Sequence, residues 1–223
     1  MKNLVILTGA GISAESGITT FRDMGGMWEQ YNIMEVASPQ GWENNKELVL
    51  NFYNERRKQL KNVKPNYGHI GLVELEEKYN VQIITQNVDD LHERAGSKNI
   101  LHLHGELIKV RSTIDPALIY TLDGWELKLG DKCEKGSQLR PHIVWFGEAV
   151  PAIEEAVAIA KKADIFVVIG TSLEVYPAAS LINYTPIDCK KYLIDPNEVN
   201  TDSSVEIIKE KAVKGVKKLI KKL

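Results

Sequence analysis

The sequence predicts an α/β fold in which a parallel sheet carries helices on both faces and a smaller lobe is inserted into the chain. Three observations support this class. Short strand-like segments at 4–7, 81–85 and 165–169 are rich in β-branched residues, as strands buried in a parallel sheet are. Longer segments of helical character separate them. The first segment leads into a glycine-rich loop, at the sheet edge where such folds bind ligands.

The first strand is followed by a loop suited to phosphate binding. Gly9, Ala10 and Gly11 carry little or no side chain, so backbone N–H groups can approach a pyrophosphate, and a helix beginning near Ser13 would add its N-terminal dipole. With Ala14, the two glycines match the G-x-G-x-x-A spacing of Rossmann-like dinucleotide sites. The alternative is a glycine-rich turn that serves chain geometry alone.

The segment after this loop does not support a dehydrogenase. That class needs a second strand ending in an acidic residue about 20 residues further on, which holds the adenosine ribose. The chain instead continues with Phe21-Arg22-Asp23 and Gly25-Gly26, and the next convincing strand is at 81–85. The hypothesis that this loop binds a phosphate therefore stands, whereas the hypothesis of a hydride-transferring dehydrogenase does not.

The composition argues against nucleic-acid-binding, membrane-spanning and secreted proteins. The 223 residues suffice for one domain with an inserted lobe, and a net charge of -2 gives no general attraction to nucleic acid. No apolar run reaches membrane-spanning length, and the first residues leave no room for a signal peptide. Cys133 and Cys189 are the only cysteines, so we expect reduced thiols in a cytoplasmic protein.

Four motifs in order carry a family resemblance. They are GAGISAESGITTFRD at 9–23, TQNVDDLHERAG at 85–96, HLHGE at 102–106 and GTSLEVYPAA at 170–179. Together they resemble the sirtuins, NAD-consuming protein deacylases. The resemblance implies a Rossmann-like NAD-binding domain made of residues 1–24, 61–107 and 142–223. Residues 25–60 and 108–141 would form the small inserted lobe.

One predicted helix, 45–61, carries a candidate reader of the acyl group. Tyr53 and Arg56 are spaced i, i+3 and share a face. The alternative is a solvated helix edge. The segment resembles the Tyr-x-x-Arg pair of class III sirtuins, and Ala37 matches the small residue that leaves space beside it. A guanidinium fork and a phenol would favour the carboxylate of succinyl, malonyl or glutaryl groups.

Polar residues follow the strand at 81–85. Gln86, Asn87 and Asp89 lie where parallel sheets bind ligands, although an Asx turn capping a helix at 90–95 is the alternative. The resemblance implies that Gln86 and Asn87 contact the nicotinamide ribose, with Asn87 also counted as catalytic. It implies that Asp89 accepts a hydrogen bond from the nicotinamide carboxamide.

A short strand at 100–103 ends near two histidines. His102 and His104 point to the same side of a regular strand. Imidazole titrates near neutral pH, as a base acting on a ribose hydroxyl requires. By resemblance His104 is the general base and ranks above His102. His69, His92 and His142 are interpreted as structural.

The inserted segment 108–141 departs from the family. Most sirtuins hold a structural zinc there with two pairs of cysteines, whereas this chain offers Cys133 alone. A structural zinc site needs four such ligands, so we predict no zinc. Alternation over 120–129 around Asp123-Gly124 predicts a β-hairpin. The apolar residues expected to hold the lobe together are Ile114, Leu118, Tyr120, Leu122, Trp125, Leu127 and Leu129.

The remaining site residues are assigned by resemblance. The segment 141–148 and the loop at 170–176 would flank an extended substrate peptide through main-chain hydrogen bonds. The substrate contacts implied there are Val144, Phe146, Gly147 and Val175. The contacts implied for the dinucleotide are Phe21, Arg22, Gly170, Thr171, Ser172, Asp195 and Ala212. Residues 203–223 are predicted as one amphipathic helix with Val205 and Ile208 facing inward.

The function that the resemblance implies is NAD-dependent removal of acidic acyl groups from protein lysines, with acetyl left open. NAD would be consumed, giving nicotinamide and O-acyl-ADP-ribose. Acylated-lysine proteins would be the partners of a monomer that binds neither nucleic acid nor membranes. An NAD-dependent ADP-ribosyltransferase and a catalytically silent NAD-binding module are the alternatives.

Overall fold

The main body of the molecule is a six-stranded parallel sheet with strand order β3-β2-β1-β7-β8-β9. The computed structural model describes residues 1–19 and 31–223. The strands are β1 (Asn3–Thr8), β2 (Asn80–Thr85), β3 (Ile100–His102), β7 (Ile165–Ile169), β8 (Lys190–Ile194) and β9 (Val205–Ile208). The predicted α/β class is confirmed.

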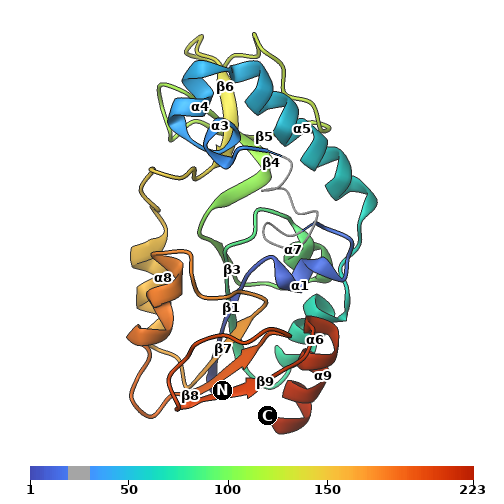
Figure 1. Cartoon of the computed structure of the whole chain (residues 1–223), viewed down its shortest axis with the longest axis vertical. Coiled ribbons are helices and arrows are strands. Elements are labelled where there is room, and N and C mark those ends of the chain that lie inside the picture. Colours follow the sequence, from blue (N-terminus) through green and yellow to red (C-terminus); the bar gives the residue numbers. More distant parts are fainter. Residues whose placement is uncertain (20–30) are drawn as a thin grey trace.

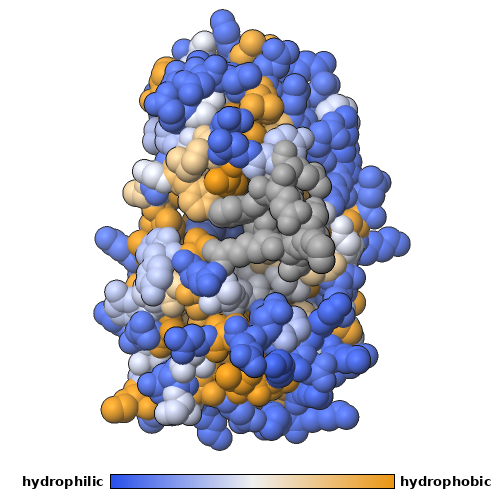
Figure 2. Space-filling model, in the orientation of Figure 1, coloured by the Kyte–Doolittle hydropathy of each residue, from blue (hydrophilic) through white to orange (hydrophobic). Residues whose placement is uncertain are grey.

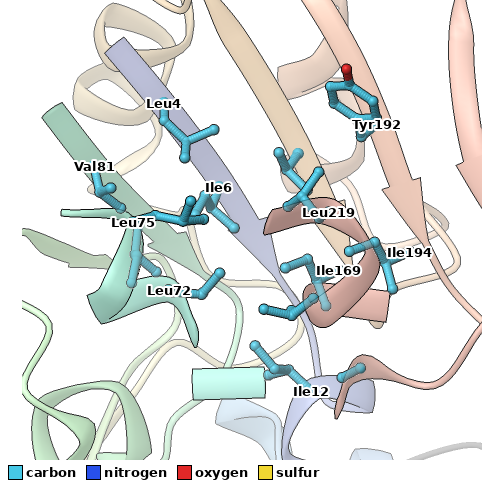
Figure 3. Packing of buried hydrophobic residues seen from close by; sticks show 14 of the residues in the cluster. Leu4, Ile6, Ile12, Leu72, Leu75, Val81, Ile169, Tyr192, Ile194 and Leu219 are labelled. Atoms are coloured by element: carbon cyan, nitrogen blue, oxygen red, sulfur yellow. The ribbon is translucent and has the colours of Figure 1, made fainter. Parts of the chain in front are cut away.

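Helices cover both faces of this sheet (Figure 1). Alternate residues of β1 point to opposite faces, so each face receives its own apolar set. Leu4 and Ile6 pack with α6 and α9 (Figure 3), whereas Val5 and Leu7 pack with α8 and the 3-10 helix η1. The covering elements are α6 (Tyr67–Leu75), α9 (Ala212–Lys222), α8 (Ile153–Ala160) and η1 (Ala178–Tyr184). Buried apolar side chains therefore pack on both faces of the sheet.

A second, antiparallel sheet of order β5-β4-β6 lies at the other end of the molecule (Figure 1). Its strands are β4 (Gly105–Ser112), β5 (Ile119–Thr121) and β6 (Leu139–Ile143), and the helices beside it are α3 (Ile33–Val36), α4 (Pro39–Asn44) and α5 (Lys46–Asn62). Trp42, Val49 and Trp145 belong to their shared core. Helix α5 confirms the helix predicted at 45–61. Two short helices, α1 (Gly11–Ala14) and α7 (Leu91–Ala95), lie between the two ends.

The hairpin predicted over 120–129 is wrong. Strand β5 pairs with β4, and residues 125–129 are not a strand. The amide of Asn54 on α5 takes the place of a partner strand, because it donates to the Leu127 carbonyl at 3.0 Å and accepts from the Leu127 N–H at 2.9 Å. Leu127 is buried as expected, whereas Ile114 and Leu129 are more than half exposed and do not hold the lobe together.

The C-terminal helix is shorter than predicted. Residues Val205–Ile208 form β9, which pairs in parallel with β8, and α9 begins only at Ala212. Val205 and Ile208 are the buried residues of β9. Their i, i+3 spacing fits the buried face of a helix equally well, which explains the wrong assignment.

In the view of Figure 2, polar residues make up most of the surface, and hydrophobic side chains reach it both near the middle and at the lower end. Among the helices at 1–19 and 31–223, none is long and apolar enough to cross a membrane. In the same ranges, no three His, Cys, Asp or Glu side chains gather in a way that could hold a metal ion.

Candidate active site

Two glycine-containing loops cross at the carboxyl ends of β1 and β7. The Gly9 N–H donates to the Ile169 carbonyl at 3.0 Å, and the Gly11 N–H donates to the Gly170 carbonyl at 2.9 Å. A Cβ atom on Gly11 would lie 2.6 Å from the Gly170 Cα atom. Glycine is therefore needed for this crossing, and the crossing brings the two predicted nucleotide loops together. The crossing supports the chain-geometry interpretation of the glycine motif, and phosphate binding by the same residues stays a prediction.

Replacing Gly170 with alanine should destabilise the fold strongly. Its φ is +65°, and a Cβ atom there would lie 2.5 Å from the Ile12 backbone nitrogen. Backbone strain and the clash together should lower the free energy of unfolding by about 2–4 kcal/mol, measured by urea denaturation. Gly130→Ala is the matched control, because φ is +99° but nothing lies within 4 Å of the added Cβ. Equal losses for the two variants would contradict the crowding argument.

Ser13 is the centre of a buried hydrogen-bond cluster. Its hydroxyl donates to Asp89 Oδ2 at 3.0 Å and accepts from Asn87 Nδ2 at 3.2 Å. His69 Nε2 is 3.4 Å from the same oxygen, and His69 Nδ1 accepts from the Asn66 N–H. His69 therefore carries its proton on Nε2 and donates to Ser13. Two side chains from the loop after β2 and one from α6 thus fix this hydroxyl.

His69 is the residue of this cluster that sequence reasoning misses. Its helical context suggests a structural role, and it does complete a capping box at the start of α6. The same ring also reaches Ser13, which is 56 positions away in the chain. Burial lowers the pKa of His69 to about 4, so the ring is neutral at physiological pH. No local pattern in the sequence signals this contact.

Asp89 has the capping role considered for it, and its contact with nicotinamide stays a prediction. Its Oδ1 accepts from the Leu91 N–H at 3.1 Å, which is the predicted turn at the start of α7, while Oδ2 binds Ser13. Burial raises the pKa of the Asp89 carboxyl, and the hydrogen bonds from Leu91 and Ser13 oppose that shift. Since each carboxylate oxygen has a second lone pair, Asp89 can still accept from a ligand.

An open pocket lies beside this cluster, between α1, α5 and the end of β2. Five of the predicted site residues line it: Ala10, Ser13, Arg56, Asn87 and Asp89. Gln86 lies beyond it and donates from Nε2 to Thr171 Oγ1 at 3.3 Å. This contact joins the polar end of β2 to the loop after β7.

His104 stands between β3 and β4 with a defined tautomer. Its Nδ1 is 3.1 Å from the Gln86 carbonyl oxygen, which can only accept, so Nδ1 carries the proton. In the neutral ring Nε2 then has a free lone pair. Burial lowers the pKa of His104, and the hydrogen bond to Gln86 partly offsets this. The ring is therefore a neutral base at physiological pH.

His102 has a different electrostatic environment. Its Nδ1 contacts the Asn87 carbonyl at 3.1 Å, and its Nε2 lies 2.7 Å from Glu93 Oε1. Burial lowers the pKa of His102, but the hydrogen bond and charge of Glu93 outweigh burial, so the net shift is upward. A proton held on both ring nitrogens leaves no lone pair for catalysis. The geometry thus favours His104 over His102 as the base.

The segment predicted to flank a substrate peptide is anchored on both sides. The Val144 N–H donates to the His104 carbonyl at 2.9 Å, and the Phe146 N–H donates to the Ala37 carbonyl at 3.0 Å. Phe146 is 41% exposed, and Gly147 is exposed beside it. Val175 is half-buried on the loop after β7. Residues 144–147 therefore connect the base to the lobe that carries Ala37.

Of the two residues predicted to contact the acyl group, Arg56 lies at the pocket and Tyr53 lies in the core of the lobe. Arg56 is half-buried and lines the pocket near Asp89. Tyr53 is only 4% exposed and accepts a hydrogen bond from Trp145 Nε1 at 3.0 Å. Burial raises the pKa of Tyr53 to about 12, against the opposing effect of Trp145 and the nearby arginines. The phenol is therefore uncharged.

The residues predicted for the adenosine end lie farther along the sheet. Ser172 is exposed and donates to Glu174, whereas Asp195 is buried and accepts from the Asn197 N–H at 2.9 Å. Ala212 is buried at the start of α9, where it packs against α1 and α6. Their contact with a nucleotide stays a prediction. Phe21 and Arg22 lie outside the described residues.

Comparison with known proteins agrees with this geometry. The chain matches the Sir2 family over residues 9–177. It is 58% identical to an NAD-dependent protein deacylase of Bacteroides thetaiotaomicron, over 98% of this chain and 97% of the relative. It is 59% identical to an NAD-dependent protein deacylase of Helicobacter pylori, over 100% of this chain and 98% of the relative.

Solved structures give the same result. A Sir2 homologue in complex with NAD superposes with a TM-score of 0.89 at 39% identity, covering 99% of this chain and 89% of that one. A Sir2 variant with a deacetylated p53 peptide and 3'-O-acetyl-ADP-ribose superposes with a TM-score of 0.83 at 32% identity, covering 98% and 92%. The chain therefore belongs to the Sir2 family.

Proposed function

We propose that the protein is an NAD-dependent protein-lysine deacylase of the class III type, which removes succinyl, malonyl or glutaryl groups and forms nicotinamide and O-acyl-ADP-ribose. Family membership and relatives named NAD-dependent protein deacylases support the reaction. The acyl preference rests on Ala37, Tyr53 and Arg56. The lobe would need no zinc, since its segment 108–141 holds a single cysteine.

The observation that carries this proposal is the convergence of a polar cluster and a neutral base on crossed glycine loops. Ser13, Asn87 and Asp89 offer a hydroxyl, an amide and a carboxylate around one pocket, which suits a ligand with an amide and sugar hydroxyls. When bound, NAD supplies an electrophilic ribose carbon, a nicotinamide leaving group and ribose hydroxyls. The donors and acceptors present fit such a group.

Each residue then has a distinct role. Asp89 accepts from the carboxamide of nicotinamide, and Asn87 holds a ribose hydroxyl. His104 accepts a ribose proton on Nε2, because its Nδ1 is already committed to Gln86. Arg56 pairs with the acyl carboxylate. Main-chain groups of 144–147 and of the loop after β7 hold the peptide, which would allow many protein substrates.

The acid limb of the pH profile should reflect His104. The base must be unprotonated, and burial lowers its pKa below 6.5. We therefore expect the midpoint of the acid limb of kcat/KM for an acetyl-lysine peptide to lie below pH 6.5. An acetyl group has no carboxylate of its own, so the substrate adds no titration. An acid limb centred above pH 6.5 would be inconsistent with His104 as the base.

Product analysis tests the proposed function directly. NAD and a succinyl-lysine peptide are incubated with the protein and analysed by mass spectrometry. The proposal expects free lysine peptide, nicotinamide and O-succinyl-ADP-ribose in equal amounts. ADP-ribosylated protein would favour the ADP-ribosyltransferase, unchanged NAD would favour a silent binding module, and NADH would indicate a dehydrogenase. Each of these three results contradicts the deacylase.

A further inference from the structure

The hydrogen bond between Trp145 and Tyr53 fixes the direction in which the phenol can donate. An indole N–H is a donor only, so at 3.0 Å the Tyr53 oxygen must act as the acceptor. The phenol's own proton then points away from Trp145 and is available to a second partner. Within residues 1–19 and 31–223, no protein acceptor for that proton is found. Tyr53 is thus held as a donor.

Burial keeps this donor protonated. Tyr53 and Trp145 are only 4% and 2% exposed, and burial raises the pKa of Tyr53 to about 12. The phenol therefore keeps its proton throughout the physiological range of pH. A neutral O–H is what a carboxylate needs, since a phenolate would repel it.

Trp145 is itself rigidly held. The Arg140 guanidinium lies 3.3 Å from the centre of the Trp145 ring, and Arg140 Nη1 contacts Glu148 Oε1 at 2.7 Å. Glu148 Oε2 also accepts from the Trp145 backbone N–H at 2.9 Å, and the Arg140 guanidinium reaches the Ile143 carbonyl at 3.0 Å. A cation over the ring face withdraws electron density from the indole and so strengthens its N–H as a donor. The Trp145 indole N–H is therefore fixed in position, and the Arg140 cation makes it a stronger hydrogen-bond donor.

We propose that Trp145 is a positioning residue for acyl selectivity: its indole N–H occupies the acceptor side of the Tyr53 phenol and thereby directs the phenol's proton to the carboxylate of an acidic acyl group. Trp145 itself does not touch the acyl group. Arg56 supplies the charge, and Tyr53 supplies the oriented second hydrogen bond. The inference rests on the acidic-acyl preference proposed above, and it names the residue that orients the reader.

The test compares succinyl and acetyl peptides in full-length variants. Trp145→Phe removes the N–H, and β-(3-benzothienyl)alanine at position 145 removes it while keeping the size of the ring. Both variants should lower kcat/KM for the succinyl peptide about tenfold, mainly through KM, with little change for the acetyl peptide. Trp42→Phe is the matched control: Trp42 is also buried, its ring lies 5.8 Å from that of Trp145, and it should leave the succinyl to acetyl ratio unchanged.

A double-mutant cycle separates the possible outcomes. If Trp145 acts through Tyr53, adding Trp145→Phe to Tyr53→Phe should not lower the ratio further. Additive losses, or an unchanged ratio in both Trp145 variants when Tyr53→Phe lowers it, would overturn this inference and leave the proposed function intact. A wild-type protein without succinyl preference, together with no effect of Tyr53→Phe, would overturn the acyl assignment itself.

Discussion

Replacing His104 with alanine should abolish deacylation and the release of nicotinamide that accompanies it. Loss of a general base costs roughly 10²–10⁴-fold in rate, so turnover should fall by at least that lower figure. His104 Nδ1 is held by the Gln86 carbonyl, and alanine leaves no group at that position that can accept a proton. The measurement is release of nicotinamide and O-acyl-ADP-ribose, followed by mass spectrometry.

His102→Gln provides the comparison for this variant. Glutamine can keep a contact with Asn87 or Glu93, and His102 has no free lone pair to lose in its doubly protonated form. Its loss of rate should be much smaller than that of His104→Ala. NAD affinity, measured by calorimetry, should be retained in both variants. Comparable losses of rate in the two variants would show that His104 is not the base.

The sequence is most informative where a pattern is local. The apolar runs of β1 and β7 are properties of a few adjacent residues, and both strands lie at their predicted positions. The glycine motif is likewise readable, although its tight crossing with Gly170 depends on a loop far along the chain. His104, the predicted base, differs from His102 on physical grounds only because Glu93 lies beside His102.

The features that escape prediction depend on contacts distant in sequence. The carbonyl and N–H of Leu127 are satisfied by Asn54, so a segment that alternates like a strand is not one. His69 reaches Ser13 through the packing of α6 beside α1, which no periodicity indicates. Strand β4 pairs with β6, which is far along the chain, and the hydrogen bond from the Val144 N–H to the His104 carbonyl also joins distant segments. These interactions are the ones that assemble the candidate site.

Arg56→Met should change substrate choice more than any other substitution considered. A buried charge-assisted pair with a carboxylate is worth about 2–5 kcal/mol when one partner is truncated, so kcat/KM for a succinyl peptide should fall roughly 30-fold or more. An acetyl group has no carboxylate to lose, and methionine fills a similar volume. Hydrolysis of the acetyl peptide should therefore fall much less. Initial rates with both peptides at saturating NAD give the ratio.

Arg56→Lys distinguishes geometry from charge. Lysine keeps the cation but not the planar fork, so its succinyl to acetyl ratio should lie between those of the wild type and Arg56→Met. The alternative role for Arg56 comes from its place near Asp89, where it would support binding of the nucleotide. In that case both peptides would lose rate equally in every variant, and KM for NAD would rise. That result would reject Arg56 as the reader of the acyl group, because a contact shared by all substrates cannot discriminate between them.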